Sequence, residues 1–130
     1  MDERTGGARD HAPSLEYAMR PSIGNVHGAM TAFNRAGCAW VSAESALLTD
    51  LARGEWGFDG YFITDMASSN AASIMAYDDG VMAGTDLYLG AGRESALAEW
   101  AYSPTFCMRM REACHRILLR WSITARRWTE

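Results

Sequence analysis

The run GYFITD at residues 60–65 constrains the fold of this chain more than any other feature. It is short, rich in aromatic and β-branched residues, and ends on a charged residue, which is typical of a parallel strand that is buried on both faces. Parallel strands need crossover connections, and these are usually helices. The sequence therefore predicts an α/β fold in which Asp65 lies at the carboxyl end of a strand.

The segments on either side alternate in the same way. GAMTAFN predicts a strand near residues 29–33, followed by the loop NRAGC, and TDLYLG predicts a brief strand over residues 85–89. Between them we expect a helix from an N-cap at Ser42 to about Arg53, with Leu47, Leu48 and Leu51 on one face. Strand, helix and strand in this order predict right-handed crossovers in a parallel sheet.

Further helices are expected outside this unit. SSNAASIMAYDD at residues 68–79 predicts a short helix, GVMAG at residues 80–84 a small-residue connection, and residues 14–20 a helical remnant. Ser103 and Pro104 form an N-cap and N1 pair for a last amphipathic helix. Its apolar face is expected to contain Cys107, Met110, Cys114 and Ile117, with Arg109, Glu112 and Arg116 on other faces.

Composition excludes several classes of function. The chain has 130 residues, 48% of them hydrophobic, a net charge of -4 and a pI of about 5.3, so it is a globular protein without a basic surface for nucleic acid or anionic membrane. No apolar run approaches the roughly 20 residues of a membrane-spanning helix. The polar start and three cysteines without CxxC spacing predict a cytoplasmic protein, with free thiols in its core and neither a disulfide framework nor a zinc site.

Residue pattern alone leaves the candidate chemistry open. Asp65 stands where α/β folds place catalytic groups, yet an Asp before Ser68 and Ser69 also suits the cap of the next helix. Asp78-Asp79-Gly80 indicates a turn or cap more strongly than half of a cation site. Five aromatic residues could stack on a sugar ring or fill the core: Trp40, Trp56, Phe58, Tyr61 and Tyr88.

The segment LLTDLARGEWGFDGYFITDM at residues 47–66 strongly resembles the part of glycoside hydrolase family 3 that leads into the nucleophile strand. MTAFNR at residues 30–35 and DGVMAGTDLYLG at residues 79–90 resemble the same family, in the same order. The closest likeness is to bacterial members with β-glucosidase activity. The resemblance implies a partial TIM-type β/α barrel, with the last strands and helices only, because a whole barrel needs about 250 residues.

We accordingly expect a disordered N-terminal tail at residues 1–17, a partial barrel domain at 18–118, and a C-terminal tail at 119–130 that does not resemble the family and fits a shifted reading frame. The resemblance implies a retaining glycosidase with Asp65 as the catalytic nucleophile. Phe33 and Met66 stand at substrate-binding positions, where the family often has Tyr and Trp. In the family a Glu from a separate α/β sandwich domain is the acid and base. Glu55 cannot replace it, because it precedes the strand that Asp65 follows.

Two functions remain after this comparison, ahead of an unrelated small α/β binding module, which would need a complete sheet of its own. One is a fragment of a retaining enzyme that acts on a β-glucoside or related sugar, needs no metal or organic cofactor and is inactive alone. The other is a non-catalytic truncated product, or a fragment that associates with a complementary chain carrying the acid/base Glu. Asp86 is expected near the start of its strand, where its loss costs stability more than chemistry.

Overall fold

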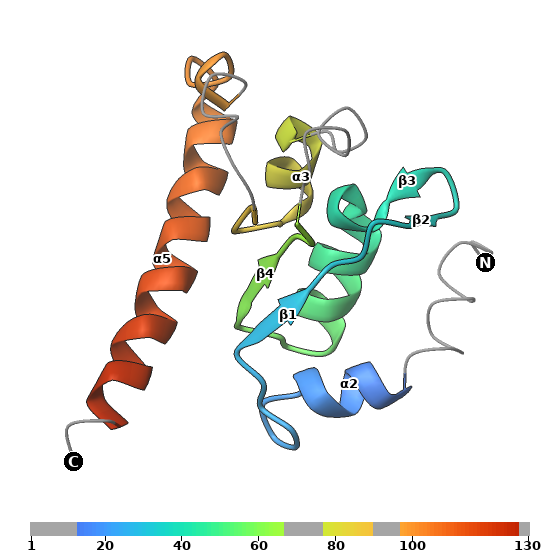
Figure 1. Ribbon diagram of the computed structural model, residues 1–130, viewed down its shortest axis with the longest axis vertical. Helices are drawn as coiled ribbons and strands as arrows, with labels where there is room; N and C mark the ends of the chain where they lie inside the picture. Colours follow the sequence, from blue (N-terminus) through green and yellow to red (C-terminus); the bar gives the residue numbers. More distant parts are fainter. Residues whose placement is uncertain (1–12, 67–76, 90–96, 128–130) are drawn as a thin grey trace.

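A computed structural model of the protein describes residues 13–66, 77–89 and 97–127 (Figure 1). The elements in chain order are α2 (Pro13–Met19), β1 (Gly28–Met30), β2 (Arg35–Ala36), β3 (Ala39–Trp40), the 3-10 helix η1 (Val41–Ala43), the π-helix η2 (Ala46–Glu55), β4 (Tyr61–Ile63), α3 (Tyr77–Ala83) and α5 (Pro104–Arg127). Helix α5 runs along one side of the molecule, and the β2–β3 hairpin projects on the opposite side (Figure 1). Helix α2 begins at Pro13, inside the segment that we expected to be a tail.

A parallel sheet lies at the centre of the fold. Strands β1 and β4 pair in parallel with Ala29 opposite Phe62. The segment at residues 85–89 extends the sheet on the other side of β4, through a parallel bridge between Ile63 and Leu87 and a 2.9 Å hydrogen bond from the Thr64 amide to the Leu87 carbonyl. The spatial order thus follows the sequence, and the predicted mixed α/β architecture with short parallel strands is confirmed.

The predicted first strand is shorter than expected, and the loop after it contains a hairpin. β1 ends at Met30 instead of near residue 33. Strands β2 and β3 then pair in antiparallel fashion around a turn at Gly37, whose φ of 66° favours glycine. The base of the hairpin is closed by a 3.2 Å hydrogen bond from the Val41 amide to the Asn34 carbonyl.

Helix η2 covers one face of the sheet and contributes Leu48, Leu51 and Ala52 to the core. Leu48 and Leu51 are buried and Leu47 packs against them, so the predicted apolar face is confirmed. The predicted N-cap at Ser42 is wrong. Ser42 lies buried in η1, where its carbonyl accepts a 2.7 Å hydrogen bond from the Thr85 hydroxyl, and the helix begins after Ser45, which makes no side-chain cap.

Helix α3 corrects the prediction for residues 80–84. The expected helix at 68–79 falls mostly outside the described residues, but α3 continues through Ala83, so GVMAG is largely helical and not a connection. The small residue at position 80 serves packing. A Cβ at Gly80 would lie 2.4 Å from the Tyr88 hydroxyl, so any larger side chain must displace the tyrosine.

Helix α5 begins as predicted but presents a different face. It starts at Pro104, and the Phe106 amide donates a 3.4 Å hydrogen bond to the Ser103 hydroxyl, which confirms the cap. The buried residues are Phe106, Ala113 and Arg120, so the buried stripe only overlaps the expected one. Of the expected residues, Cys107, Met110 and Ile117 are half-buried and Cys114 is exposed, so the prediction is wrong at Cys114. The buried stripe is rotated because arginines on this face reach inward to carboxylates. The helix runs to Arg127 and so includes most of the expected C-terminal tail.

The cysteines do not lie in the core. Cys38 and Cys114 are exposed and Cys107 is half-buried, and all three are free thiols. The expectation of free thiols is confirmed, but their placement in the core is wrong. Cys38 lies in the hairpin turn, and Cys114 lies on the outer side of α5. The periodicity of the sequence does not distinguish these two positions from buried ones.

Candidate functional site

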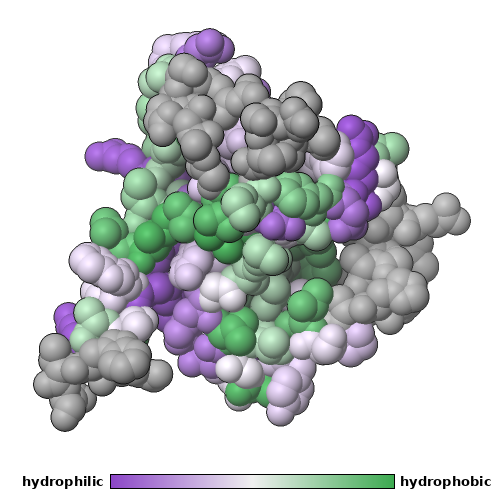
Figure 2. Space-filling model, in the orientation of Figure 1, coloured by the Kyte–Doolittle hydropathy of each residue, from purple (hydrophilic) through white to green (hydrophobic). Residues whose placement is uncertain are grey.

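The two faces of the parallel sheet have different environments. Phe62 and Thr64 are buried, Phe62 in the core beneath η2. Met30, Ile63 and Leu87 share the opposite face, since they are neighbours in register, and we call this side the open face. Met30 is 64% exposed and Leu87 is 38% exposed. Figure 2 shows hydrophobic side chains in a band across the middle of the face seen in that view.

Asp65 lies just beyond the carboxyl end of β4. Successive strand residues alternate between faces, so Asp65, two residues after Ile63, falls on the open face. Its side chain is partly exposed, and its Oδ1 accepts a 2.7 Å hydrogen bond from the Met66 amide. Within residues 13–66, 77–89 and 97–127, no ion pair involves Asp65. The carboxylate is therefore accessible, as both a nucleophile and a cap would be, and the helix that it would cap falls outside the described residues.

The two predicted substrate-binding residues follow the same ends of the strands. Phe33 comes after β1 and is 37% exposed, while Met66 comes after β4 and is 63% exposed. Parallel strands bring their carboxyl ends to one edge of a sheet, so Phe33, Asp65 and Met66 occupy a common edge. A role for Phe33 and Met66 in sugar binding stays a prediction.

A network of buried charges occupies the other end of the strands. The Asp86 side chain is fully buried, and its two oxygens contact Arg53 at 2.6 Å and Arg116 at 2.8 Å. Asp86 Oδ2 also accepts a 2.8 Å hydrogen bond from the Phe62 amide at the start of β4. Arg53 donates further hydrogen bonds to the carbonyls of Gly60 at 2.8 Å and Gly84 at 3.2 Å. This network joins η2, β4, the segment at residues 85–89 and α5.

The charges in this network are mutually dependent. Burial lowers the pKa of the Arg53 guanidinium from its ordinary value, and the negative charge of Asp86 opposes that shift. Arg120, also buried, pairs with Asp59 in the loop before β4. The sequence missed the role of Arg116 because helical spacing assigned this residue to another face of the helix. The only available signal was the predicted position of Asp86 near the start of its strand, which is confirmed.

Glu55 lies where the sequence predicted. It is the last residue of η2, exposed, and it precedes β4, whereas Asp65 follows β4. The two carboxylates thus belong to opposite ends of the strand. Glu55 is not placed to act as the acid partner of Asp65, because a retaining pair needs its carboxyl groups about 5–5.5 Å apart.

An apolar cavity of about 330 Å³ lies beside β1, on the side of α2 and η2. Its lining includes Leu15, Met19, Leu47 and Trp56 and contains no charged side chain. The cavity borders the core and does not include Asp65, Phe33 or Met66. We therefore assign it to packing between the helices and the sheet and not to the candidate catalytic edge.

Metal binding and membrane insertion find no structural support in the part of the chain that the structure describes. Across the three described ranges, no group of three or more His, Cys, Asp or Glu side chains is placed to hold a metal ion. Among the helices in the same ranges, none has both the length and the apolar character needed to cross a bilayer.

Comparison with known proteins gives a likeness of fold. No protein-family model matches the sequence, and no curated protein matches it. Among solved structures, the chain is similar to the β-N-acetylhexosaminidase from Beutenbergia cavernae DSM 12333, with a TM-score of 0.64 and 24% sequence identity. The match covers 75% of this chain and 34% of that protein, so the chain spans about a third of its length. The described α/β arrangement therefore matches part of a glycoside hydrolase.

Proposed function

We propose that this chain is the carboxyl-terminal part of the barrel of a retaining glycoside hydrolase of family 3, with Asp65 as its nucleophile. The fold likeness to part of a glycosidase supports the class of enzyme. The resemblance of residues 47–66 to the segment before the family's nucleophile supports the residue. The first is a likeness of backbone shape and the second is a likeness of sequence.

The position of Asp65 carries the proposal. The residue follows a parallel strand at its carboxyl end, where β/α barrels keep their catalytic groups, and its partly exposed carboxylate is on the open face. A nucleophilic carboxylate must be ionised and reachable by the sugar. Asp86, by contrast, is enclosed by two arginines and a backbone amide, so it cannot approach a substrate.

The proposed reaction has two steps. An oxygen of Asp65 attacks the anomeric carbon and forms a covalent ester, while the glycosidic bond breaks and the leaving oxygen takes a proton from a carboxylic acid on the other side of that bond. Water then attacks the same carbon, gives its proton to that carboxylate, and releases both the sugar and the ionised Asp65. The acid is a Glu supplied by a complementary chain or domain.

The substrate is a neutral β-linked glycoside. The sequence resemblance favours a β-glucoside, and the activity named for the similar solved structure adds a β-N-acetylhexosaminide as a second sugar to test. The described residues include no metal cluster, and the proposed two-step chemistry requires neither a metal nor an organic cofactor.

The exposed open face favours a fragment that associates with a complementary chain. Met30 and Leu87 are 64% and 38% exposed, although in a closed barrel the positions at 30 and 87 would line the packed interior. Such a surface is stabilised by covering it with further strands. A chain that completes the barrel would also bring the remaining sugar contacts.

Activity of the purified chain tests the fragment interpretation first. Because the acid partner and most sugar contacts are missing, the chain alone should not hydrolyse an aryl β-glucoside or an aryl β-N-acetylglucosaminide. The release of the aryl group is measured by absorbance. Turnover that disappears in Asp65→Ala would contradict the need for a complementary chain.

The role of Asp65 is tested by grafting this segment into a full-length relative, where the graft should hydrolyse β-glucosides with retention. Asp65→Ala should reduce kcat by several orders of magnitude and leave the fold intact, because no other carboxylate can form the ester. Asp50→Ala is the matched control, since Asp50 is an exposed acid on η2. A slow fluorinated glucoside should label the peptide that contains Asp65. Label on another peptide, or full activity in Asp65→Ala, would overturn the assignment.

A further inference from the structure

We propose that the β2–β3 hairpin carries a sugar-binding platform made of Trp40 and Arg35, beside the edge of the sheet that bears Asp65. The inference rests on the proposed function for its class of ligand, a neutral pyranoside. It adds to that function a contact which the resemblance does not supply.

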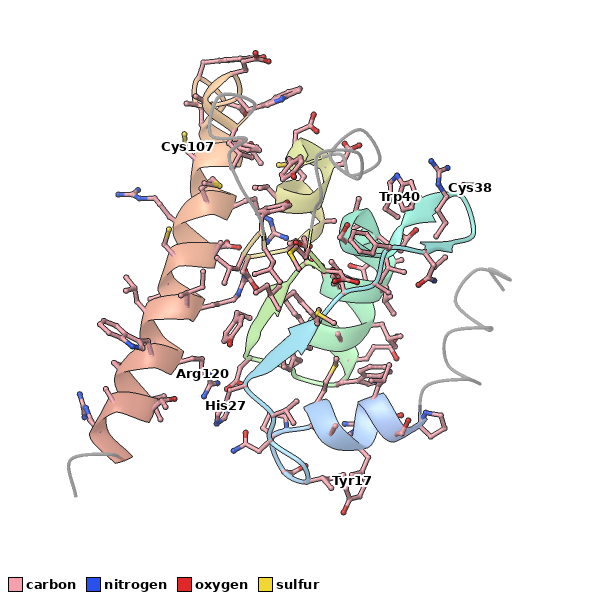
Figure 3. All side chains as sticks on the ribbon, viewed as in Figure 1. Tyr17, His27, Cys38, Trp40, Cys107 and Arg120 are labelled. Carbon is pink, nitrogen blue, oxygen red and sulfur yellow. The ribbon has the colours of Figure 1, made fainter. Side chains whose placement is uncertain are left out.

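The hairpin stands at the catalytic end of the sheet. It follows β1 directly, so it leaves the sheet at the carboxyl end of that strand, and Asp65 follows the carboxyl end of the neighbouring strand β4. Figure 3 shows Trp40 and Cys38 on the hairpin, far from His27 and Arg120, which lie toward the opposite end of the strands. A ligand held on the hairpin would therefore be on the side of Asp65 and not on that of the charge network.

Trp40 and Arg35 form one preassembled unit. They are partners in the register of the hairpin, and the guanidinium carbon of Arg35 lies 4.5 Å from the centre of the Trp40 ring. Arg35 Nη1 also donates a 3.2 Å hydrogen bond to the Cys38 carbonyl, which fixes the guanidinium across the turn. The half-buried indole thus has one face against a cation. We propose that the accessible part of the indole is where the ligand stacks.

The structure separates Trp40 from the other aromatic residues that could stack on a sugar. Trp56 and Phe58 are 6% and 2% exposed and belong to the core. Tyr61 begins β4 at its amino end and lies over Gly28. Tyr88 is half-buried, as Trp40 is, but its hydroxyl donates a 2.8 Å hydrogen bond to the Tyr77 carbonyl and its ring packs against the Tyr77 ring at a centroid distance of 4.9 Å. Of these five candidates, Trp40 is therefore the one we select as a stacking surface at the carboxyl end.

The chemistry of the pair suits a sugar ring. A pyranose has a flat patch of C–H groups and a rim of hydroxyls. A tryptophan offers a large, rigid apolar surface on which the C–H groups can stack. An arginine offers five N–H donors in a planar fork to the hydroxyls. Because the pair carries one positive charge next to an aromatic face, it favours an uncharged ring with many acceptors over an apolar ligand.

The test uses the purified chain and cellobiose, a neutral β-linked disaccharide, in saturation-transfer NMR. The wild-type chain should transfer magnetisation to the ring protons of cellobiose, and Trp40→Ala should weaken the affinity at least about fivefold. Trp121→Ala is the matched control, because Trp121 is 71% exposed on α5 and belongs to no proposed site. Trp40→Phe should retain part of the affinity, since a smaller aromatic surface remains.

Two further variants make the outcome decisive. Arg35→Gln should weaken the binding of cellobiose without removing the indole. If circular dichroism shows that Trp40→Ala is unfolded, the affinity of Arg35→Gln tests the platform in its place. Asp50→Ala, at an exposed acid on η2, should bind cellobiose as well as wild type, and the nucleophile assignment is tested separately by labelling in the graft, so a failed nucleophile assignment and a failed platform give different results. Absence of transfer to cellobiose in the wild type, or equal affinity in Trp121→Ala, Trp40→Ala and Arg35→Gln, would overturn the proposal.

Discussion

The two ends of the same parallel strands place aspartates in opposite environments. At the amino end, Asp86 is fully buried between Arg53 and Arg116, and it also accepts a hydrogen bond from the backbone of β4. At the carboxyl end, Asp65 is partly exposed and its only hydrogen bond among the described residues is to the next amide. The comparison indicates that the position of an aspartate along a strand, more than the residue type, decides whether its carboxylate is structural or reactive.

This contrast follows from what each end must do. An unpaired buried charge is costly, so the amino end can keep Asp86 ionised only by surrounding it with donors. A nucleophile must stay accessible and cannot be enclosed in that way. The two ends should therefore respond differently to the same substitution, and the following predictions run from the largest expected effect to the smallest.

Asp86→Ala should have the largest effect on stability. Removing the carboxylate leaves Arg53 and Arg116 without their shared partner, and breaking a buried ion pair on one side typically costs about 3–5 kcal/mol. The free energy of unfolding is measured by urea titration with circular dichroism. Asp86→Asn should lose less stability than Asp86→Ala, because it keeps an acceptor for the Phe62 amide. Equal stability of wild type and Asp86→Ala would remove the basis of the comparison.

Tyr88→Phe should have an intermediate effect that depends on pH. Burial raises the pKa of the Tyr88 hydroxyl above its ordinary value, so the folded protein keeps this proton at a pH where the unfolded chain has lost it. Stability from this group is complete below about pH 10 and falls above it, by up to about 1.4 kcal/mol per pH unit.

Below pH 10, Tyr88→Phe should cost about 1 kcal/mol, the worth of its hydrogen bond to the Tyr77 carbonyl. Above pH 10, the variant should lose less stability with rising pH than the wild type does. Urea titrations at several pH values between 8 and 11 would show this. Parallel pH profiles for the two proteins would mean that Tyr88 ionises normally in the folded state.

Asp65→Ala should have the smallest effect on the isolated chain. A partly exposed side chain outside any ion pair of the described residues changes stability by about 0.5 kcal/mol or less when it is replaced. The same urea titration applies, with Asp86→Ala as the contrasting variant. A loss of several kcal/mol would show that Asp65 is a structural cap, and the nucleophile assignment would lose its physical support.

The alternation of elements could be predicted from the sequence because it rests on local patterns. The run at residues 60–65, the apolar face of η2 and the cap at Ser103 each depend on neighbours within a few residues. The orientation of α5 could not be predicted in the same way. Arg116 turns inward to reach Asp86, 30 residues away, and helical spacing treats an arginine as exposed.

The candidate site likewise has features that could be predicted from local sequence and features that could not. The place of Asp65 at the end of β4 follows from the strand pattern, but its chemistry comes only from the resemblance to a family. The β2–β3 hairpin was expected to be a plain loop, because its strands have two residues each and no alternation to detect. A glycine with a positive φ at position 37 was its one local sign, and glycine also suits an ordinary loop.

Two exposed methionines, Met30 in β1 and Met66 just after β4, have a consequence for oxidation chemistry. Met30 and Met66 are 64% and 63% exposed, whereas Met19 is 8% exposed. A mild oxidant converts accessible thioethers to polar sulfoxides, so it should modify the first two well before the third. Once oxidised, Met30 would add a polar group to the open face and weaken any later association through it. Peptide masses after a brief peroxide pulse would thus record whether that face was covered at the moment of exposure.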